Sequence, residues 1–230
     1  MLRRLSPELM DDPTLPPEAL AGALSGLSRL NALSGAFGRT FREIERESRR
    51  HSEPLRVLDI ACARGDFVVR AARLGEERGL RATFAGCDVN PNSIRLARQS
   101  AASRGLSCDF LEHDAVSSPL PSGFSCCVAS LFFHHLEASD AVRLLQNMAV
   151  QCDCVIVNDL VRSPVNLAMI AVASRAVTRS PVVHADAVLS ARAAFTRDEM
   201  RELAECAGLR GATIKFGGIS RMMLVWRKPN

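Results

Sequence analysis

The sequence predicts a doubly wound α/β fold with a mostly parallel, seven-stranded sheet whose last strand runs antiparallel. Short apolar, β-branched runs alternate with helix-like segments from residue 55 to residue 159. Three consecutive runs end in or near an acidic residue. Two more runs close the chain on either side of Gly217 and Gly218, and strands this close pair antiparallel.

The composition is that of a soluble globular protein. The chain has 230 residues, of which 47% are hydrophobic and 23% are charged, so wholesale disorder and a coiled coil are excluded. No apolar run reaches the roughly 18 residues that a membrane-spanning helix needs. The first residues carry two arginines without the apolar core of a secretory signal, and we expect a cytoplasmic protein without stable membrane insertion.

The charge and cysteine patterns argue against nucleic acid and metal ions as partners. The net charge is +4, and the arginines alternate with acids along the chain, so no basic face for nucleic acid is expected. The eight cysteines include no C-x-x-C pair, which argues against a zinc site, and we expect no metal. Several lie in buried-looking runs, where reduced cysteine serves as a small apolar residue.

Residues 1–53 are predicted to form an N-terminal helical cap. A turn-rich stretch at residues 11–17 precedes a helix that begins near Glu18. Glycines inside the region weaken one long helix, so two or three short helices are expected. Residues 54–230 then form the main domain, beginning after a junction at Pro54.

The main domain is predicted strand by strand. After the first strand a helix ends near Gly75, and Asn90 followed by Pro91 gives a good start to the next helix. Residues 140–148 are helical in pattern, and Thr196 opens a capping box for a later helix. The predicted strands are residues 55–61, 82–88, 108–114, 124–130, 154–159, 212–216 and 222–226.

Residues 160–195 interrupt the alternation and are too long for an ordinary loop. Their alanine, valine and leucine content predicts one or two added helices, which we interpret as a lid over an apolar substrate pocket. A helix lying on a membrane surface and a helix that extends the core are the alternatives.

The acids at the strand ends suit a nucleoside that carries an amino-acid tail. Ligands bind beyond the carboxyl ends of strands in an open parallel sheet. For such a ligand, Asp88 could accept both ribose hydroxyls and Asp59 could face an ammonium group. Asp114 could accept from an adenine amine, with the Ala115 backbone beside the ring.

These residues carry a family resemblance. Residues 57–65, Asp88, Asp114 and residues 131–136 resemble the class I S-adenosylmethionine-dependent methyltransferases, over about residues 55 to 160. The family's first loop is rich in glycine, whereas Ala61 and Ala63 stand at two of its positions here. The resemblance implies S-adenosylmethionine as cofactor, with these binding residues: Asp59, Ala61, Gly65, Asp88, Val89, Asp114, Ala115 and Leu131.

Two further stretches, residues 7–12 and 158–162, are similar to a subgroup found with bacterial polyketide pathways. This similarity implies methyl transfer to an oxygen of a phenolic or quinone-type compound. A protein that binds S-adenosylmethionine without turnover, an NAD-dependent oxidoreductase and a methyltransferase for nucleic acid or protein are the alternatives. The oxidoreductase would need a glycine-rich turn for its pyrophosphate, and the first loop offers one glycine, Gly65.

His135, and after it His134, are the candidates for a catalytic base. A phenol must lose its proton to attack the sulfonium carbon, and histidine is the usual base near neutral pH. Transfer by proximity alone is the alternative. The expected partner is a small-molecule acceptor, and a homodimer is one open possibility for the assembly.

Overall fold

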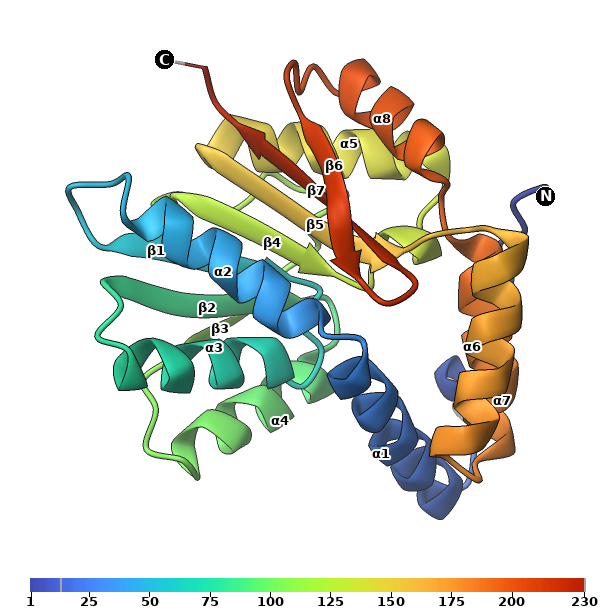
Figure 1. Cartoon of the computed structure of the whole chain (residues 1–230). Helices are drawn as coiled ribbons and strands as arrows, with labels where there is room; N and C mark the ends of the chain where they lie inside the picture. The colour runs from blue at the N-terminus through green and yellow to red at the C-terminus, as the bar shows by residue number, and fades with distance from the viewer. Residues whose placement is uncertain (13, 230) are drawn as a thin grey trace.

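The computed structural model describes residues 1–12 and 14–229, and all seven predicted strands are present within one sheet (Figure 1). The strand order is β3-β2-β1-β4-β5-β7-β6. Only β7 runs antiparallel to its neighbours β5 and β6, as the closing glycine-linked pair predicts. The strands are β1 (Leu55–Ile60), β2 (Ala82–Asp88), β3 (Asp109–Glu112), β4 (Cys126–Ser130), β5 (Cys154–Leu160), β6 (Thr213–Gly218) and β7 (Arg221–Arg227).

Eight α-helices and two 3₁₀ turns surround this sheet within the described residues. Among their predicted ends, the Asn90 side chain caps α4 and Thr196 forms the capping box of α8. The helices are α1 (Pro17–Leu33), α2 (Ala36–Ser48), α3 (Asp66–Glu77), α4 (Pro91–Ala102), α5 (Ala138–Gln151), α6 (Pro164–Val177), α7 (Pro181–Ala193) and α8 (Arg197–Cys206), and the 3₁₀ turns are η1 (Leu9–Asp11) and η2 (Phe133–His135).

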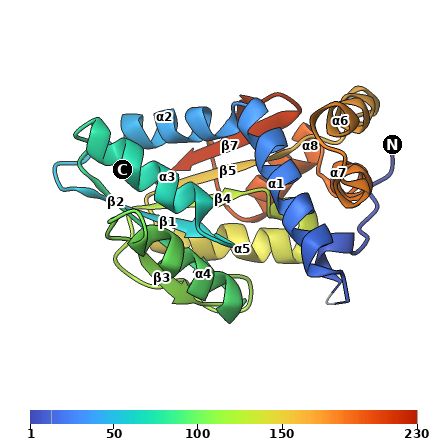
Figure 2. The same cartoon turned by 90° about the horizontal axis from the view of Figure 1, so that it is seen from below.

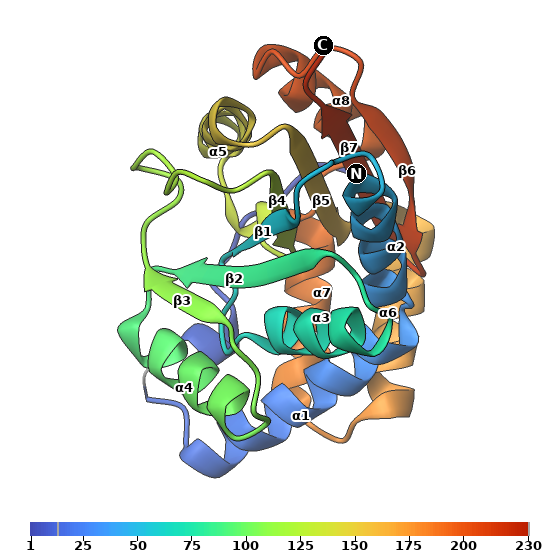
Figure 3. The same cartoon turned by 90° about the vertical axis from the view of Figure 1, so that its left-hand side faces the viewer.

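The sheet is covered on both faces. Helices α2, α3 and α4 bury apolar side chains such as Phe41 and Val68 against one face. Helices α5 and α8 bury residues such as Leu144 and Met200 against the other. Figures 2 and 3 show the sheet between α5 on one side and α2 and α3 on the other. Because helices cover both faces, a ligand can reach the sheet at the carboxyl ends of the strands.

Three helices stand apart from these two layers. Helix α1 packs against α6 and α7 at the carboxyl ends of the parallel strands (Figure 1). Residues far apart in the sequence, before β1 and after β5, therefore meet at one edge of the sheet. Among the described residues, no helix is both long and apolar enough to cross a bilayer.

One local expectation is confirmed and one is wrong. The helices expected before the main domain are α1 and α2, which are separated at Ser34 and Gly35, and Gly22 and Gly26 lie inside the 17 residues of α1. A Cβ at Gly26 would lie 2.6 Å from Thr178 Oγ1, so the glycine serves close packing against the end of α6 and does not break the helix. Cys127 and Cys152 are joined in a disulfide across 25 residues of sequence, so not all eight cysteines are free. Their pairing depends on the approach of β4 to the end of α5, which spacing does not reveal.

Candidate functional site

The loop after β1 keeps a backbone shape that normally requires glycine. Ala61, Ala63 and Gly65 have φ values of 53°, 47° and 75°, all in the left-handed region. That conformation costs a non-glycine residue about 1–2 kcal/mol. The two alanines therefore occupy a conformation that favours glycine, and this strains the loop.

Neighbouring groups hold this loop in place. The Ala63 amide donates to Asp88 Oδ2 at 2.9 Å, and the Cys62 amide donates to the Cys87 carbonyl at 2.9 Å. A Cβ at Gly65 would lie 2.7 Å from the Phe110 ring, so glycine is the residue that fits there. The loop is thereby fixed to the ends of β2 and β3.

Asp59 lies beneath the loop and is 4% exposed. Its Oδ1 is a buried atom with no hydrogen-bond partner among the described residues. Burial, and next the nearby Asp88, raise the pKa of the Asp59 carboxyl well above its ordinary value. A cationic group bound at the loop would offset both effects, so this acid fits the ammonium end of an amino-acid cofactor.

The other predicted cofactor residues follow the next two strands. Asp88 ends β2, half-buried, and its Oδ1 accepts from the Asn90 amide at 2.9 Å. Val89 beside it is 66% exposed. Asp114 is exposed and accepts from the Ser117 hydroxyl at 2.6 Å, while Ala115 is buried. Asp114 thus stabilises its own turn, and the hydrogen bonds from Ser117 lower the pKa of its carboxyl.

A cavity of about 270 Å³ lies beyond the ends of β4, β5 and β7. It begins at Leu131, which follows β4 with a φ of 56°, and extends under α1, α6 and α7. His134 and His135 line it as well. Its apolar wall includes Leu27, Leu30, Leu33, Leu160, Met169, Ile170, Ala173, Val177 and Val183.

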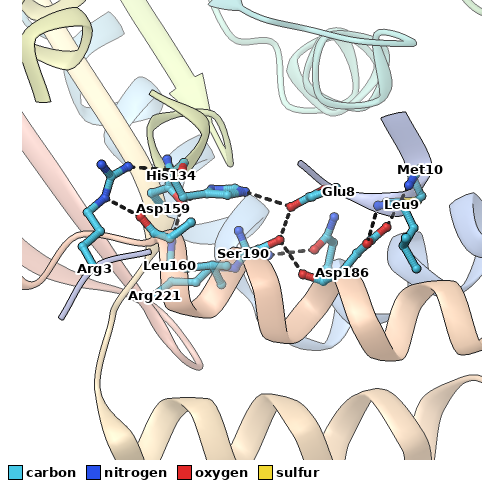
Figure 4. Close-up of polar contacts among 12 residues, drawn as sticks. Arg3, Glu8, Leu9, Met10, His134, Asp159, Leu160, Asp186, Ser190 and Arg221 are labelled. Atoms are coloured by element: carbon cyan, nitrogen blue, oxygen red, sulfur yellow. Dashed lines mark hydrogen bonds and ion pairs between the residues drawn. The ribbon is translucent and has the colours of Figure 1, made fainter. Parts of the chain in front are cut away.

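A buried His–Asp pair stands at the polar end of this cavity (Figure 4). His134 Nδ1 lies 2.7 Å from Asp159 Oδ1, and the His134 amide donates to Asp159 Oδ2 at 3.1 Å. The two residues are 4% and 2% exposed. Because the carboxylate only accepts, Nδ1 carries the proton and Nε2 is directed toward Glu8 Oε1, 3.8 Å away.

The pair is tuned by opposing effects. Burial lowers the pKa of the His134 imidazole, but the Asp159 carboxylate and Glu8 outweigh it, and this pKa lies above its ordinary value. Burial raises the pKa of the Asp159 carboxyl, but His134 and the Leu160 amide bring it below its ordinary value. A histidine with a raised pKa is a stronger base than a free imidazole.

The N-terminal segment completes this end of the cavity. Glu8 accepts a hydrogen bond from the Ser190 hydroxyl of α7 (Figure 4). Asp186 of α7 accepts from the Leu9 and Met10 amides at 2.7 and 3.0 Å. These contacts fasten residues 8–10 across the cavity, close to His134.

The structure brings together most of the predicted site residues, in two neighbouring groups. Asp59, Ala61, Gly65 and Asp88 surround the loop after β1. Leu131, His134 and His135 line the cavity. Sequence reasoning missed the cavity residues Glu8, Asn31, Asp186, Ser190 and Arg221, and it missed Asp159, which binds His134. Of these, Asp159 carried a usable signal, because it is an acid at the end of a predicted strand.

Comparison with known proteins gives this architecture a family. Residues 57–152 match the family model described as a methyltransferase domain. This segment, somewhat less than half of the chain, is thus similar to a methyltransferase domain. It contains the loop after β1 and the ends of β2, β3 and β4, where the predicted cofactor residues lie.

Curated relatives match part of the methyltransferase domain. The demethylmenaquinone methyltransferase of Thermus thermophilus is 40% identical over 70 residues, covering 30% of this chain and 30% of that protein. The corresponding enzyme of Deinococcus radiodurans is 37% identical over 86 residues, covering 37% and 34%. The chain thus spans about a third of the length of these two relatives.

Solved structures match more of the chain at lower identity. The plantazolicin methyltransferase BpumL in complex with SAH has a TM-score of 0.67 at 14% identity, covering 90% of each chain. A putative O-methyltransferase from Nostoc punctiforme has a TM-score of 0.63 at 18% identity, covering 99% of this chain and 64% of that one. At these identities the likeness shows that the whole chain shares the fold.

Replacing a strained alanine in the loop should stabilise the protein. We expect Ala63→Gly to raise the free energy of unfolding by about 0.5 kcal/mol or more, because relief of about 1–2 kcal/mol exceeds the flexibility cost of glycine. Urea denaturation measures the change. Ala21→Gly, at an exposed position inside α1, is the control and should cost about 1 kcal/mol. Equal destabilisation by both variants would contradict the assignment of strain.

Metal removal tests a second feature. Glu8, His134 and His135 each offer a ligand atom, and these atoms lie within 4.8 Å of one another. His134 already faces a carboxylate from each ring nitrogen, and Glu8 accepts from Ser190, so we keep the expectation of no metal. Dialysis against EDTA should leave methyl transfer and thermal stability unchanged. Loss of either, restored by zinc or magnesium, would assign the three residues to a cation.

Proposed function

We propose that the protein transfers a methyl group from S-adenosylmethionine to an oxygen of a small phenolic or quinone-type acceptor. The observation that carries this proposal is the buried, carboxylate-held His134, which lines an apolar cavity that reaches Leu131 at the end of β4, the strand next to β1. The acceptor would then lie near Leu131, which lines the cavity, where His134 could remove its proton and the cofactor could donate the methyl group.

The cofactor assignment rests on the acids and on the retained loop shape. Asp59, with Ala61 and Gly65 of the loop, would hold the amino-acid end of S-adenosylmethionine. Asp88 and Val89 would hold the ribose, with Asp114 and Ala115 at the adenine. S-adenosylmethionine supplies a methyl group made electrophilic by the positive sulfur, so the protein has to orient the acceptor and remove its proton.

His134 is the better base candidate of the two histidines. Its Nδ1–H bond to Asp159 fixes the ring, which leaves Nε2 to take the acceptor proton. Asp159 then stabilises the imidazolium that forms, as a buried carboxylate does for a catalytic histidine. His135 is exposed and lines the same cavity, so it remains the second candidate.

The helices around the cavity favour a small acceptor with an apolar body. We interpret residues 1–53 as an N-terminal cap and residues 160–195 as a helical lid. Helices α1, α6 and α7 supply most of the apolar wall, while Glu8, His134 and Ser190 gather at one end. An aromatic ring with an oxygen directed to that end satisfies both parts.

Carbon methylation of the same kind of ring is the second candidate. It is favoured by the relatives named demethylmenaquinone methyltransferase, and by the Rhodopseudomonas palustris relative named a C-methyltransferase, which is 30% identical over 119 residues. Removing a phenol proton raises electron density on both the oxygen and the ring carbons, so His134 would serve either outcome. Analysis of the methylated product by NMR distinguishes an ether from a ring methyl group.

Cofactor binding is the first test of the proposal. Wild-type protein should bind S-adenosylhomocysteine in a calorimeter, and Asp88→Ala should abolish measurable binding because it removes the ribose acceptor and releases the Ala63 amide. Asp109→Ala, an exposed acid at the start of β3, is the matched control and should bind normally. Near-normal affinity of Asp88→Ala would remove the ribose assignment.

The pH dependence tests the base. His134 accepts a proton only when neutral, so kcat should rise with pH through a pKa above 6.5. His134→Gln should lower kcat by at least about 100-fold. Asp159→Asn removes the carboxylate that raises this pKa, so the rising limb should move to lower pH.

His135→Gln is the control, since it removes an imidazole from the same cavity and should keep the rising limb in place. If this variant loses the limb and His134→Gln retains it, His135 is the base. A rate independent of pH in the wild-type protein would favour transfer by proximity alone.

A further inference from the structure

The cavity contains a second charged side chain, Arg221, besides the residues of the proposed proton transfer. Arg221 begins β7, lines the same cavity as His134 and is 6% exposed. Its Nη2 donates to Asn31 Oδ1 of α1 at 2.7 Å. Figure 4 places Arg221 near the His134–Asp159 pair and α7.

Arg221 lacks a close counter-ion. Among the described residues, no carboxylate oxygen lies within 4.0 Å of its nitrogens, and its Nε has no hydrogen-bond partner. Arg162 gives the contrast at 5% exposure, because its Nη1 and Nη2 donate to Glu199 at 2.9 and 2.5 Å. Arg162, which does not line the cavity, therefore has a carboxylate partner, whereas the equally buried Arg221, which does line it, has none within this distance among the described residues.

The acids around the cavity are engaged elsewhere. Asp159 accepts from His134 and from the Leu160 amide. Asp186 accepts from two backbone amides, and Glu8 accepts from Ser190. Burial lowers the pKa of Arg221 to about 10, with Asp159 raising it in part, so the guanidinium stays charged at neutral pH. A buried cation of this kind is unfavourable until an anion reaches it.

The backbone around Arg221 is built to hold this position. Ser220 has a φ of 58°, an unfavourable value for serine. The Ile219 amide donates to the Ser34 carbonyl at 2.9 Å, which ties the β6–β7 turn to the end of α1. A Cβ at Gly218 would lie 2.6 Å from the same carbonyl. This close contact brings Arg221 and Asn31 together at the cavity wall.

We propose that Arg221 and Asn31 form a subsite for an anionic oxygen of the methyl acceptor, either a carboxylate or an ionised ring hydroxyl. Guanidinium binds both groups through charged hydrogen bonds. The inference rests on the proposed function, because it specifies the acceptor as an acidic aromatic compound. The apolar wall, for example Leu30 and Ile170, would contact the rest of that compound.

Matched probe pairs test the subsite on the full chain saturated with S-adenosylhomocysteine. 4-Hydroxybenzoate and 4-hydroxybenzamide differ in a carboxylate, and 4-nitrophenol above its pKa and 4-nitroanisole differ in a phenolate. Calorimetry should show at least tenfold tighter binding of the anion in one pair, which identifies the source of the negative oxygen. Equal affinity within both pairs, or no binding of either anion at millimolar concentration, overturns the proposal.

Variants assign that preference to Arg221. Arg221→Gln should lose the preference, and Arg221→Lys should retain part of it by keeping the charge. Arg179→Gln removes the same charge from an exposed position between α6 and α7 and should behave as wild type. A preference that survives in folded Arg221→Gln, as judged by circular dichroism, overturns the subsite. If Arg221→Gln does not fold, the same test is made with Arg221→Lys, which should lose part of the preference for the anion.

Cofactor affinity separates this inference from the proposed function. Wild-type protein that fails to bind S-adenosylhomocysteine contradicts the methyltransferase proposal, and the probe pairs are then measured on the protein alone. Normal cofactor binding without anion preference contradicts the subsite and leaves the methyltransferase proposal standing. If Arg221→Gln weakens S-adenosylhomocysteine binding tenfold, Arg221 serves the cofactor carboxylate, and its assignment to the acceptor is wrong.

Discussion

The buried contact between His134 and Asp159 is the interaction on which the arrangement of the cavity depends. One carboxylate binds both the ring and the backbone amide of His134, so it fixes the turn after β4 to the end of β5. A buried carboxylate or imidazolium alone would be costly, and each compensates the other. The same geometry directs Nε2 toward Glu8, which brings the N-terminal segment into the site.

Charge is distributed differently at the two parts of the site. Around the loop after β1, Asp59 and Asp88 make the electrostatic potential negative, and Asp59 Oδ1 has no hydrogen-bond partner among the described residues. This environment suits a cationic cofactor. The cavity is lined by the acids Glu8 and Asp186 and also by the basic side chains of His134 and Arg221. A cavity with both charges and an apolar wall can bind a molecule with an acidic end and an apolar body. The sheet places these two environments side by side because β1 and β4 are neighbours.

The sequence predicted the parts of the site that depend on one strand and its end. Asp59 and Asp88 follow apolar runs, and a parallel sheet brings such ends to one edge, so their proximity could be inferred. Glu8, Asn31 and Arg221 could not be found in this way. They reach the cavity through the packing of α1, α7 and the β6–β7 turn, which no local pattern encodes. The close packing of α1 against Thr178 could not be predicted either, because Gly26 resembles a helix breaker in the sequence.

In the loop after β1, alanine stands at two positions with a left-handed backbone and glycine at the third. Ala63 is exposed and Ala61 is half-buried, and both keep left-handed φ values at an energetic cost. Gly65 is buried against Phe110, and a Cβ there would overlap the ring. Replacement by alanine is therefore seen where its methyl group has room, and glycine remains where it has none. The strain at the first two positions is tolerable because hydrogen bonds from the Cys62 and Ala63 amides to the end of β2 hold the loop. Alanine at these two positions is thus compatible with the left-handed backbone of this loop.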